Sequence, residues 1–298
     1  MVSLNIMEIE RFAISDGPGI RTTVFLQGCP LYCPWCSNPE SQKIKTHLFH
    51  LESKCIGCRR CESFCKQNAI KFKENKFTFN ENLCIFCKDC ALKCIQNAIS
   101  FVGEKTSISD IISEIEKDDD YYKSSGGGVT ISGGEPFVQF EGFFELCKRL
   151  KEKNYHVCVE TTGQTTIDKC NKISDYVDLF LIDYKHSNSK KLKEVTGGDL
   201  EIIETTIKTL LNNKSNQVIV RIPVIPNFNH TKEDMNQIFK RLEELKVTEV
   251  HLLPFHNFGK TKYKQMRKDY FYESVPSLNK KDLEIYLQEK WNFKLYIK

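Results

Sequence analysis

The chain has 298 residues, a length that allows one large or two ordinary domains with a sizeable core. Its 43 Lys and Arg residues against 39 Asp and Glu residues give a formal charge of +4, too small and too dispersed to indicate nucleic-acid binding. The N-terminus lacks a basic region followed by an apolar one, and no apolar run approaches the ~20 residues of a membrane span, so we expect a cytoplasmic protein without a membrane anchor.

The first predicted strands flank a glycine-rich turn. Residues 1–15 have the apolar pattern of a short strand, and the segment Asp16-Gly-Pro-Gly-Ile-Arg21 predicts a tight turn. Residues 22–27 are rich in β-branched and aromatic side chains, which predicts a buried strand. A cysteine-containing loop leaves the carboxyl end of this strand, the end where parallel barrels place their chemistry.

That loop contains Cys29, Cys33 and Cys36 in a Cys-x3-Cys-x2-Cys pattern. A cubane iron–sulfur cluster or a structural zinc ion takes four protein ligands, so three thiols leave one metal position open to another ligand. An open iron is a place for chemistry. The alternatives are a zinc site completed by a distant His, or reduced thiols in a core.

Residues 50–102 contain two copies of a second cysteine pattern, offset by 29 residues. Each copy reads Cys-x2-Cys-x2-Cys-x3-Cys, the run of bacterial two-cluster ferredoxins, in which the fourth cysteine of each half ligates the other half's cluster. One predicted [4Fe-4S] cluster therefore has the ligands Cys55, Cys58, Cys61 and Cys94, and the second has Cys84, Cys87, Cys90 and Cys65. Lys66 and Ile95 replace the proline that usually follows the fourth cysteine, and a zinc ribbon would show paired Cys-x2-Cys instead.

The function of this insert is less constrained than its metal content. Iron–sulfur potentials span roughly −700 to +450 mV, so the sequence sets neither the direction nor the driving force of electron transfer. Electron relay to the Cys29 cluster is one hypothesis. A structural role, or docking of a partner enzyme, is the other.

A helix and a glycine-rich strand end follow the insert. Residues 108–115 have helical apolar spacing with Ser107 as the N-cap, and we interpret residues 116–120 as a solvated face. Residues 129–132 predict a buried strand that ends in Gly133-Gly-Glu-Pro136. Glycines at a strand end permit close approach of the backbone to a ligand.

The remainder alternates strand and helix signals, which predicts parallel βα units. Strands are expected near residues 155–160, 178–183, 217–223 and 249–254, a helix at 140–151, and an edge strand in the tail at 291–297. With the strands near 22 and 129 this makes six, and polar residues recur at their carboxyl ends. We interpret the basic stretch at 260–268, with Tyr263 and Tyr270, as a solvated loop rather than a nucleic-acid site.

With Trp35 before its last cysteine, the loop resembles the cluster motif of radical S-adenosylmethionine enzymes. The Asp16 to Arg21 turn, the next strand, Gly28-Cys29 and Cys36-Ser-Asn38 together resemble the signature of glycyl radical enzyme activating enzymes. The resemblance covers nearly the whole chain. It implies a partial (β/α)6 barrel at residues 1–48 and 103–298, with a ferredoxin-like insert carrying two [4Fe-4S] clusters at 49–102.

The resemblance also implies roles for single residues. Cys29, Cys33 and Cys36 would hold the catalytic cluster, Gly134 and Glu135 would receive the methionine amino group, and Asp16 would meet the partner polypeptide. Glu160 and Thr161 match a pair that helps to hold a monovalent cation, although glutamate replaces aspartate here. The residues expected to bind S-adenosylmethionine are Trp35, Ser37, Gly133, Gly134, Glu135, Glu160, Thr161, Asp183, Tyr184, Lys185, Arg221 and His256.

The implied activity is reductive cleavage of S-adenosylmethionine and hydrogen abstraction from a glycine Cα of a glycyl radical enzyme, giving a glycyl radical, methionine and 5'-deoxyadenosine. Three [4Fe-4S] clusters, S-adenosylmethionine and a monovalent cation are the expected cofactors. A low-potential donor such as flavodoxin or ferredoxin would reduce the protein, which we expect to be a monomer. A radical S-adenosylmethionine enzyme acting on a small molecule remains an alternative, as does an iron–sulfur electron carrier, which would leave the strand-end motifs unexplained.

Overall fold

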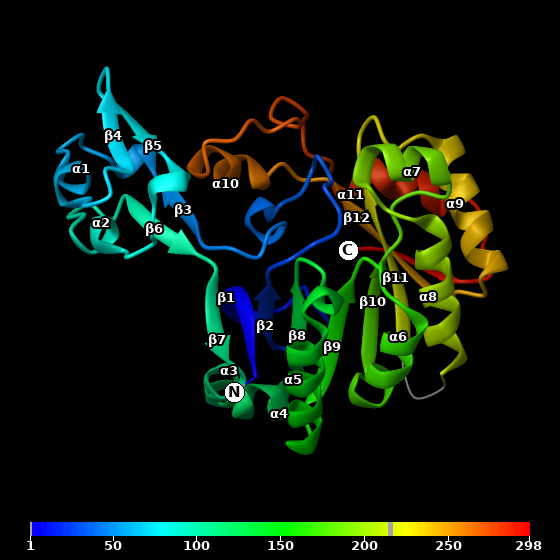
Figure 1. The fold of residues 1–298 in the computed structure, drawn as a ribbon. Coiled ribbons are helices and arrows are strands. Elements are labelled where there is room, and N and C mark those ends of the chain that lie inside the picture. The colour runs from blue at the N-terminus through cyan, green and yellow to red at the C-terminus, as the bar shows by residue number, and fades with distance from the viewer. Residues whose placement is uncertain (1, 214–216) are drawn as a thin grey trace.

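The computed structural model describes residues 2–213 and 217–298 and shows a large α/β unit with a smaller unit projecting from one side (Figure 1). Among the described residues, nine strands form one sheet in the order β13-β12-β11-β10-β9-β8-β2-β1-β7. The strands of this sheet are β1 Ser3–Ala13, β2 Arg21–Leu26, β7 Glu104–Ser107, β8 Gly128–Gly133, β9 His156–Thr161, β10 Leu179–Asp183, β11 Gln217–Val224, β12 Glu249–Pro254 and β13 Lys294–Ile297.

Most of the sheet is parallel. Strands β2 and β8 to β13 pair in parallel, whereas β1 runs antiparallel to both β2 and β7. The six strands expected from the sequence are confirmed, and so are the first strand and the edge strand in the tail. The register aligns Leu26 with Gly133 and Asp183 with Arg221, so the segments that follow these strands leave from one edge.

Helices pack against one face of this sheet and bury its main core (Figure 1). They are α3 Ile108–Ile115, α4 Asp119–Ser125, α5 Phe140–Glu152, α6 Ile167–Ile173, α7 Ser189–Thr196, α8 Leu200–Asn212, α9 Lys232–Glu244 and α11 Lys280–Leu283. Phe143, Leu146 and Leu150 of α5 are completely buried at i, i+3 and i+7 positions, the spacing of one helical face. Ser107 caps α3 as predicted, because its hydroxyl accepts a hydrogen bond from Asp110 N at 3.1 Å.

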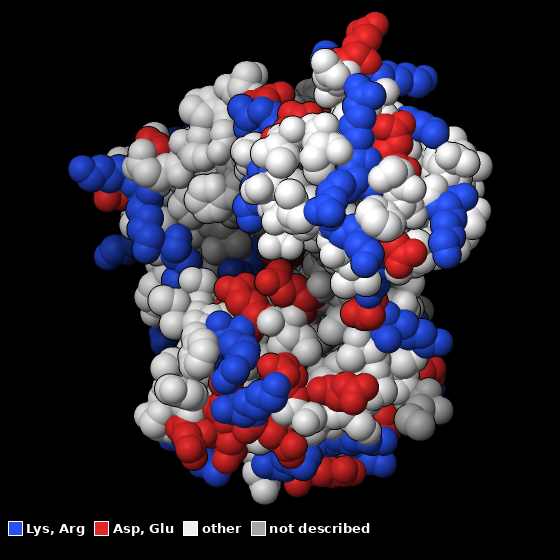
Figure 2. All heavy atoms as spheres, turned by 90° about the vertical axis from the view of Figure 1, so that its left-hand side faces the viewer, with Lys and Arg blue, Asp and Glu red and all other residues white. Residues whose placement is uncertain are grey.

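The projecting unit contains two small sheets, formed by β3 His47–His50 with β6 Ile99–Val102 and by β4 Ile70–Lys73 with β5 Lys76–Phe79. Two short helices, α1 Arg60–Phe64 and α2 Asp89–Leu92, complete it. Arg59 and Lys88, which are 29 residues apart, precede these helices with positive φ angles of 57° and 65°. The sequence repeat therefore has a matching backbone repeat. Figure 2 looks onto the side of the molecule from which this unit projects.

Two surface interpretations were wrong in part, although Glu116, Lys117 and Asp120 are exposed as expected. Asp118, in the segment interpreted as a solvated face, is 1% exposed and accepts hydrogen bonds from the Arg11 guanidinium. The basic stretch forms α10 Gly259–Gln265 and a following turn, with Tyr263 and Tyr270 buried. In both segments a charged side chain reaches a partner far away in the sequence, which local composition does not reveal. Within residues 2–213 and 217–298, none of the helices is both long and apolar enough to cross a membrane.

Candidate active site

The cysteine loop after β2 meets two other motifs in one cavity of about 230 Å³. The motif residues among those that line this cavity include Cys29, Cys33, Trp35, Cys36, Ser37, Gly133, Gly134, Asp183 and Lys185. These segments are far apart in the sequence, and they meet because parallel strands place their carboxyl ends at the same edge of the sheet. We call this space the thiol cavity.

The shape of the cysteine loop is set by its backbone and by Trp35. Gly28 N donates a hydrogen bond to Ser41 O at 2.6 Å, which closes the base of the loop. Trp35 is 7% exposed, and its ring centroid lies 4.7 Å from that of Phe228. Packing of this large ring anchors the loop between its second and third cysteines.

Burial makes the three thiols poor acids when no metal is bound. It raises the pKa of Cys29 and of Cys33 to about 12 and also raises the pKa of Cys36. A bound metal displaces such protons because it binds the thiolate. Among the described residues, no group of three or more His, Cys, Asp or Glu side chains forms a site for one metal ion. A cubane cluster instead attaches its thiolates to separate irons, and three thiols lining one cavity fit that requirement.

Lys185 and Asp183 place an opposite pair of charges at the thiol cavity. Lys185 Nζ lies 2.6 Å from Asp183 Oδ2, and the lysine side chain is 7% exposed. Burial lowers the pKa of Lys185, but attraction to the Asp183 carboxylate outweighs it, and the pKa ends above its usual value. Lys185 therefore stays cationic at neutral pH, and the pair suits a ligand with both a carboxylate and an amino group.

The Gly133-Gly134 segment packs directly on the cysteine loop. Gly134 N donates to Leu26 O at 2.8 Å, and Glu135 N donates to Gly28 O at 2.7 Å. A Cβ on Gly134 would lie 2.3 Å from Gly28 O. Gly134 therefore has no side chain because the two backbone segments approach too closely to accommodate one. Its backbone also lines the thiol cavity.

Glu135 points into the protein rather than lining the thiol cavity. It is 0% exposed, and its carboxylate accepts hydrogen bonds from Thr161 Oγ1 at 2.8 Å and from Thr162 N at 2.7 Å. Thr161 is thereby engaged as well. In this geometry Glu135 and Thr161 brace the end of β9 against the turn after β8, and their predicted ligand contacts remain predictions.

Glu160 of β9 forms an ion pair with Arg221 of β11, across the one intervening strand, β10. Its carboxylate also accepts a hydrogen bond from Ser132 Oγ at 2.5 Å. Burial raises the pKa of Glu160, and the Arg221 guanidinium opposes that rise. The predicted cation at Glu160 would share the carboxylate with this arginine.

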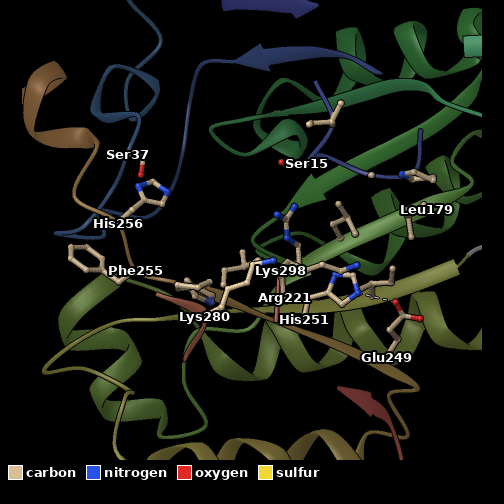
Figure 3. Close-up of a pocket in the computed structure, with 18 of the residues that line it drawn as sticks. Ser15, Ser37, Leu179, Arg221, Glu249, His251, Phe255, His256, Lys280 and Lys298 are labelled. Carbon is tan, nitrogen blue, oxygen red and sulfur yellow. Dashed lines mark hydrogen bonds and ion pairs between the residues drawn. The ribbon is translucent and has the colours of Figure 1, made fainter. Parts of the chain in front are cut away.

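A second cavity, of about 710 Å³, lies next to the first (Figure 3). Trp35 and Ser37 line both cavities, which makes them neighbours. Arg221 and His256 line the larger one, where Figure 3 shows His256 close to Ser37. We call this space the large cavity. Its inner wall includes apolar residues of β10 and β11, namely Leu179, Leu181 and Ile219.

Besides Glu135 and Thr161, two further predicted site residues have their side chains outside both cavities. The Asp16 carboxylate accepts a hydrogen bond from Thr23 Oγ1 at 2.8 Å, while its neighbours Ser15 and Gly17 line the large cavity. Tyr184 is 0% exposed, and its hydroxyl donates to Glu204 Oε1 at 3.0 Å in the helix-covered core. Successive side chains of an extended segment point to opposite faces, so Tyr184 points away from the face that presents Asp183 and Lys185.

The insert thiols gather in two pockets. One pocket is lined by Cys55, Cys58, Cys61 and Cys94, and the other by Cys65, Cys84, Cys87 and Cys90. These are the two sets expected from the ferredoxin pattern. Ala69 N donates to Cys65 Sγ at 3.3 Å, and Ala98 N donates to Cys94 Sγ at 3.2 Å. When these two cysteines bind a cluster as thiolates, the same N–H groups can donate hydrogen bonds to their sulfur atoms.

Sequence reasoning missed the role of the segment around α10. Lys262 Nζ donates to Asn38 Oδ1 at 2.6 Å and to Glu40 Oε1 at 2.5 Å, just after the third cysteine. The Arg267 guanidinium lies over Phe77 and Phe79 of β5, at 5.5 and 5.1 Å from their ring centroids. The segment thus contacts both the cysteine loop and the insert. The sequence signal that could have indicated a packed segment was the presence of Tyr263 and Tyr270 within and just after the basic stretch.

Comparison with known proteins agrees with this geometry. The family model described as a 4Fe-4S single cluster domain matches residues 15–200. The 4-hydroxyphenylacetate decarboxylase activating enzyme of Clostridioides difficile is 36% identical over 94% of this chain and 90% of its own length. The choline trimethylamine-lyase activating enzyme of Oleidesulfovibrio alaskensis is 37% identical over 94% and 92%. Among solved structures, Streptococcus suis SuiB bound to precursor peptide SuiA matches with a TM-score of 0.50 and 16% identity, covering 65% of this chain and 43% of that one.

Fold, thiol cavity and comparisons define the class, an iron–sulfur enzyme that uses S-adenosylmethionine. Within that class, the chain belongs to the family of glycyl radical enzyme activating enzymes. Its activity is accordingly the S-adenosylmethionine-dependent generation of a glycyl radical on a partner enzyme.

Proposed function

We propose that this reaction takes place where the thiol cavity meets the large cavity. The observation that carries the proposal is the convergence of Cys29, Cys33 and Cys36 with Gly134 and Lys185 around one space. The three thiols would hold a [4Fe-4S] cluster with one iron free for S-adenosylmethionine. When bound, the cluster supplies the electron that splits this cofactor into methionine and a 5'-deoxyadenosyl radical.

The side chains of this chain would orient the cofactor and its target. Lys185 and Asp183 offer complementary charges to the methionine carboxylate and amino groups, beside the backbone of Gly134. Arg221 and His256 lie in the adjoining large cavity, which suits the nucleoside and the glycine-bearing segment of the partner. Trp35 lines both cavities, and its ring would help to exclude water from the space where they meet.

The large unit would be a partial (β/α)6 barrel made of residues 1–48 and 103–298. Residues 49–102 would be a ferredoxin-like insert with one [4Fe-4S] cluster in each thiol pocket. Three clusters would then be present, with an external low-potential donor such as flavodoxin or ferredoxin supplying electrons. A monomeric cytoplasmic protein, with a monovalent cation near Glu160, completes the proposal.

The partner would be a glycyl radical enzyme whose radical-bearing glycine enters the large cavity. Two relatives, 36% and 37% identical to this chain, are named as the activating enzymes of a decarboxylase and of a lyase. Such similar identities to activators of different enzymes favour a common glycine-recognition surface. The chemistry of the partner's small-molecule substrate would then be decided on the partner chain.

Anaerobic S-adenosylmethionine cleavage tests the site directly. The reconstituted, dithionite-reduced protein should form 5'-deoxyadenosine, and Cys33→Ala should abolish it while keeping the insert clusters. Cys170→Ala, in the buried core on α6, is the matched control for Cys33→Ala and should retain cleavage.

The iron content of the wild type is a separate test. Reconstitution should give about twelve irons per wild-type chain from three four-iron clusters. Retained cleavage in Cys33→Ala would refute the assignment, and a stable wild-type value near eight irons would remove one cluster.

A further inference from the structure

The insert exposes an unusual amount of apolar side chain. Its six exposed large hydrophobic residues, between 44% and 79% accessible, are Ile56, Phe64, Leu83, Ile85, Leu92 and Ile95. We call this set the insert rim. Apolar surface in water costs about 25 cal/mol per Å², and a patch of it bordered by polar residues indicates an interaction site.

Half of the insert rim lines the two thiol pockets. Ile56 and Ile95 line the pocket of Cys58, and Ile85 lines the pocket of Cys87. Both of these cysteines are exposed. The Lys93 ammonium lies 5.6 Å from the ring centroid of Phe64, which brings the ends of α1 and α2 together. The rim therefore lies where a partner can come closest to the thiols.

The same unit carries exposed cationic side chains beside its thiols. Residues 49–102 contain nine Lys and Arg and five Asp and Glu, and the thiolates of two bound clusters would offset this positive net charge, so the local positions of the cations matter more than their sum. Arg60, Lys66 and Lys93 are exposed close to the thiols. On the side shown in Figure 2, Lys and Arg side chains gather beside uncharged surface in the upper half of the molecule. Exposed cationic side chains grouped next to the thiols favour an acidic partner at this point of contact and speed its association.

The two cavities of the proposed active site are built elsewhere. The described residues that line the thiol cavity and the large cavity all lie outside residues 49–102. A glycine that enters those cavities needs no contact with the insert rim. This separation favours an electron donor, rather than the enzyme being activated, as the occupant of the rim.

We propose that the insert rim docks an acidic one-electron carrier protein, which loses one electron as an insert cluster gains one. This inference rests on the proposed function, because it assumes clusters in the two insert pockets. Apolar contacts would hold the carrier close to Cys58 or Cys87, and Arg60, Lys66 and Lys93 would orient its acidic surface.

Binding of a reduced acidic flavodoxin, measured by anaerobic calorimetry, provides a test that does not depend on catalysis. The double variant Leu92→Glu/Lys93→Glu changes the rim without altering a cysteine or a residue that lines a thiol pocket. We expect its Kd to rise at least tenfold and the wild-type Kd to rise with salt. Lys190→Glu on α7 reverses a charge whose side chain is 85% exposed, and it should leave the Kd unchanged. An unchanged Kd in the double variant would overturn the proposal.

Two reductants separate docking from the cleavage reaction. Flavodoxin-driven formation of 5'-deoxyadenosine should fall at least fivefold in the double variant, whereas dithionite-driven formation and iron content should match the wild type. Equal losses with both reductants would contradict a docking role. Loss of partner activation with dithionite, at normal 5'-deoxyadenosine formation, would assign the rim to the glycyl radical enzyme instead. If the wild type did not cleave S-adenosylmethionine with dithionite, the proposed function would be refuted. The calorimetric Kd of the double variant would then still test the docking role of the insert rim.

Discussion

At the scale of single residues, hydrogen-bond partners distinguish side chains that line the candidate site from side chains that brace it. Lys185 and Glu135 both come from predicted cofactor motifs, yet Lys185 lines the thiol cavity while the carboxylate of Glu135 is occupied by Thr161 and Thr162. A buried carboxylate with such donors fixes backbone geometry. Sequence motifs alone do not distinguish these two tasks.

Lys185→Met should weaken S-adenosylmethionine binding. A hydrogen bond to a charged group contributes about 1.5–3 kcal/mol, so we expect the Kd to rise about 10- to 150-fold. Anaerobic calorimetry on the reconstituted protein measures this change. Lys191→Met removes a lysine outside the cavity lining and should bind normally. Equal affinity in Lys185→Met and the wild type would exclude the ammonium from the ligand site.

Asp118→Asn should destabilise the fold in a pH-dependent way. The hydrogen bond from Arg11 holds the pKa of the buried Asp118 below its usual value, and Thr22 donates to the same carboxylate at 2.7 Å. The folded pKa is depressed, so the stabilisation is complete above the unfolded pKa near 3.9 and is lost as pH falls through the lower folded value.

We expect Asp118→Asn to lower the free energy of unfolding by about 1–3 kcal/mol at pH 7, with a smaller difference near pH 3. Urea unfolding followed by circular dichroism measures both. Asp120→Asn changes an exposed neighbour and should be almost neutral. Equal costs for the two substitutions would contradict a specific role for the Arg11 pair.

At the scale of elements, the turn that carries Asp16 interlocks with the start of β8. A Cβ on Gly127 would lie 1.8 Å from Ile20 O, so the backbone of the turn lies directly against this glycine. Arg21 is 0% exposed, and its Nη1 donates to Pro18 O at 2.9 Å. The two glycine-rich motifs therefore fit each other as one structural unit beside the large cavity.

Gly127→Ala should displace this turn and lower stability by about 1–3 kcal/mol, with loss of partner activation. Gly126→Asn is the matched control, because Gly126 has φ of +68° in open space and asparagine tolerates that conformation. Thermal unfolding and the yield of glycyl radical measure the two effects. Normal radical yield in Gly127→Ala would show that the interlock is dispensable for function.

The α10 segment connects the insert to the cysteine loop, and Lys262→Met should break that connection. Glu40 is 1% exposed and would lose its cationic partner, so we expect a cost of about 1–3 kcal/mol and a slower transfer of electrons to S-adenosylmethionine. Lys264→Met removes a nearby, 65% exposed lysine as a control. Stopped-flow reduction and urea unfolding measure the effects. Wild-type values for both would contradict the connecting role.

Elements with strong local signals were predictable, and long-range partners were not. Buried strands such as β8 and β10 follow from short runs of β-branched or other apolar residues, and Ser107 caps α3 as its sequence indicates. The thiol cavity follows from the ends of parallel strands. By contrast, the contact of Lys262 with Glu40 and that of Arg11 with Asp118 join residues more than 100 positions apart. Composition and periodicity hold no information on such pairs.

At the scale of the whole molecule, the two proposals give the two units different tasks. The large unit presents the thiol cavity and the large cavity along one sheet edge, and the insert carries the exposed thiols and exposed cationic side chains. The α10 segment contacts both units. We infer that electrons enter through the insert and that hydrogen abstraction takes place on the large unit.

The central claim is that the radical formed on the large unit removes hydrogen from a glycine Cα of the partner. A partner enzyme containing α-deuterated glycine, mixed anaerobically with the reduced protein and S-adenosylmethionine, tests it by mass spectrometry of 5'-deoxyadenosine. The account predicts one deuterium in 5'-deoxyadenosine, together with the electron paramagnetic resonance signal of a glycyl radical on the partner. Unlabelled 5'-deoxyadenosine with no partner radical, across the glycyl radical enzymes tested, would contradict it.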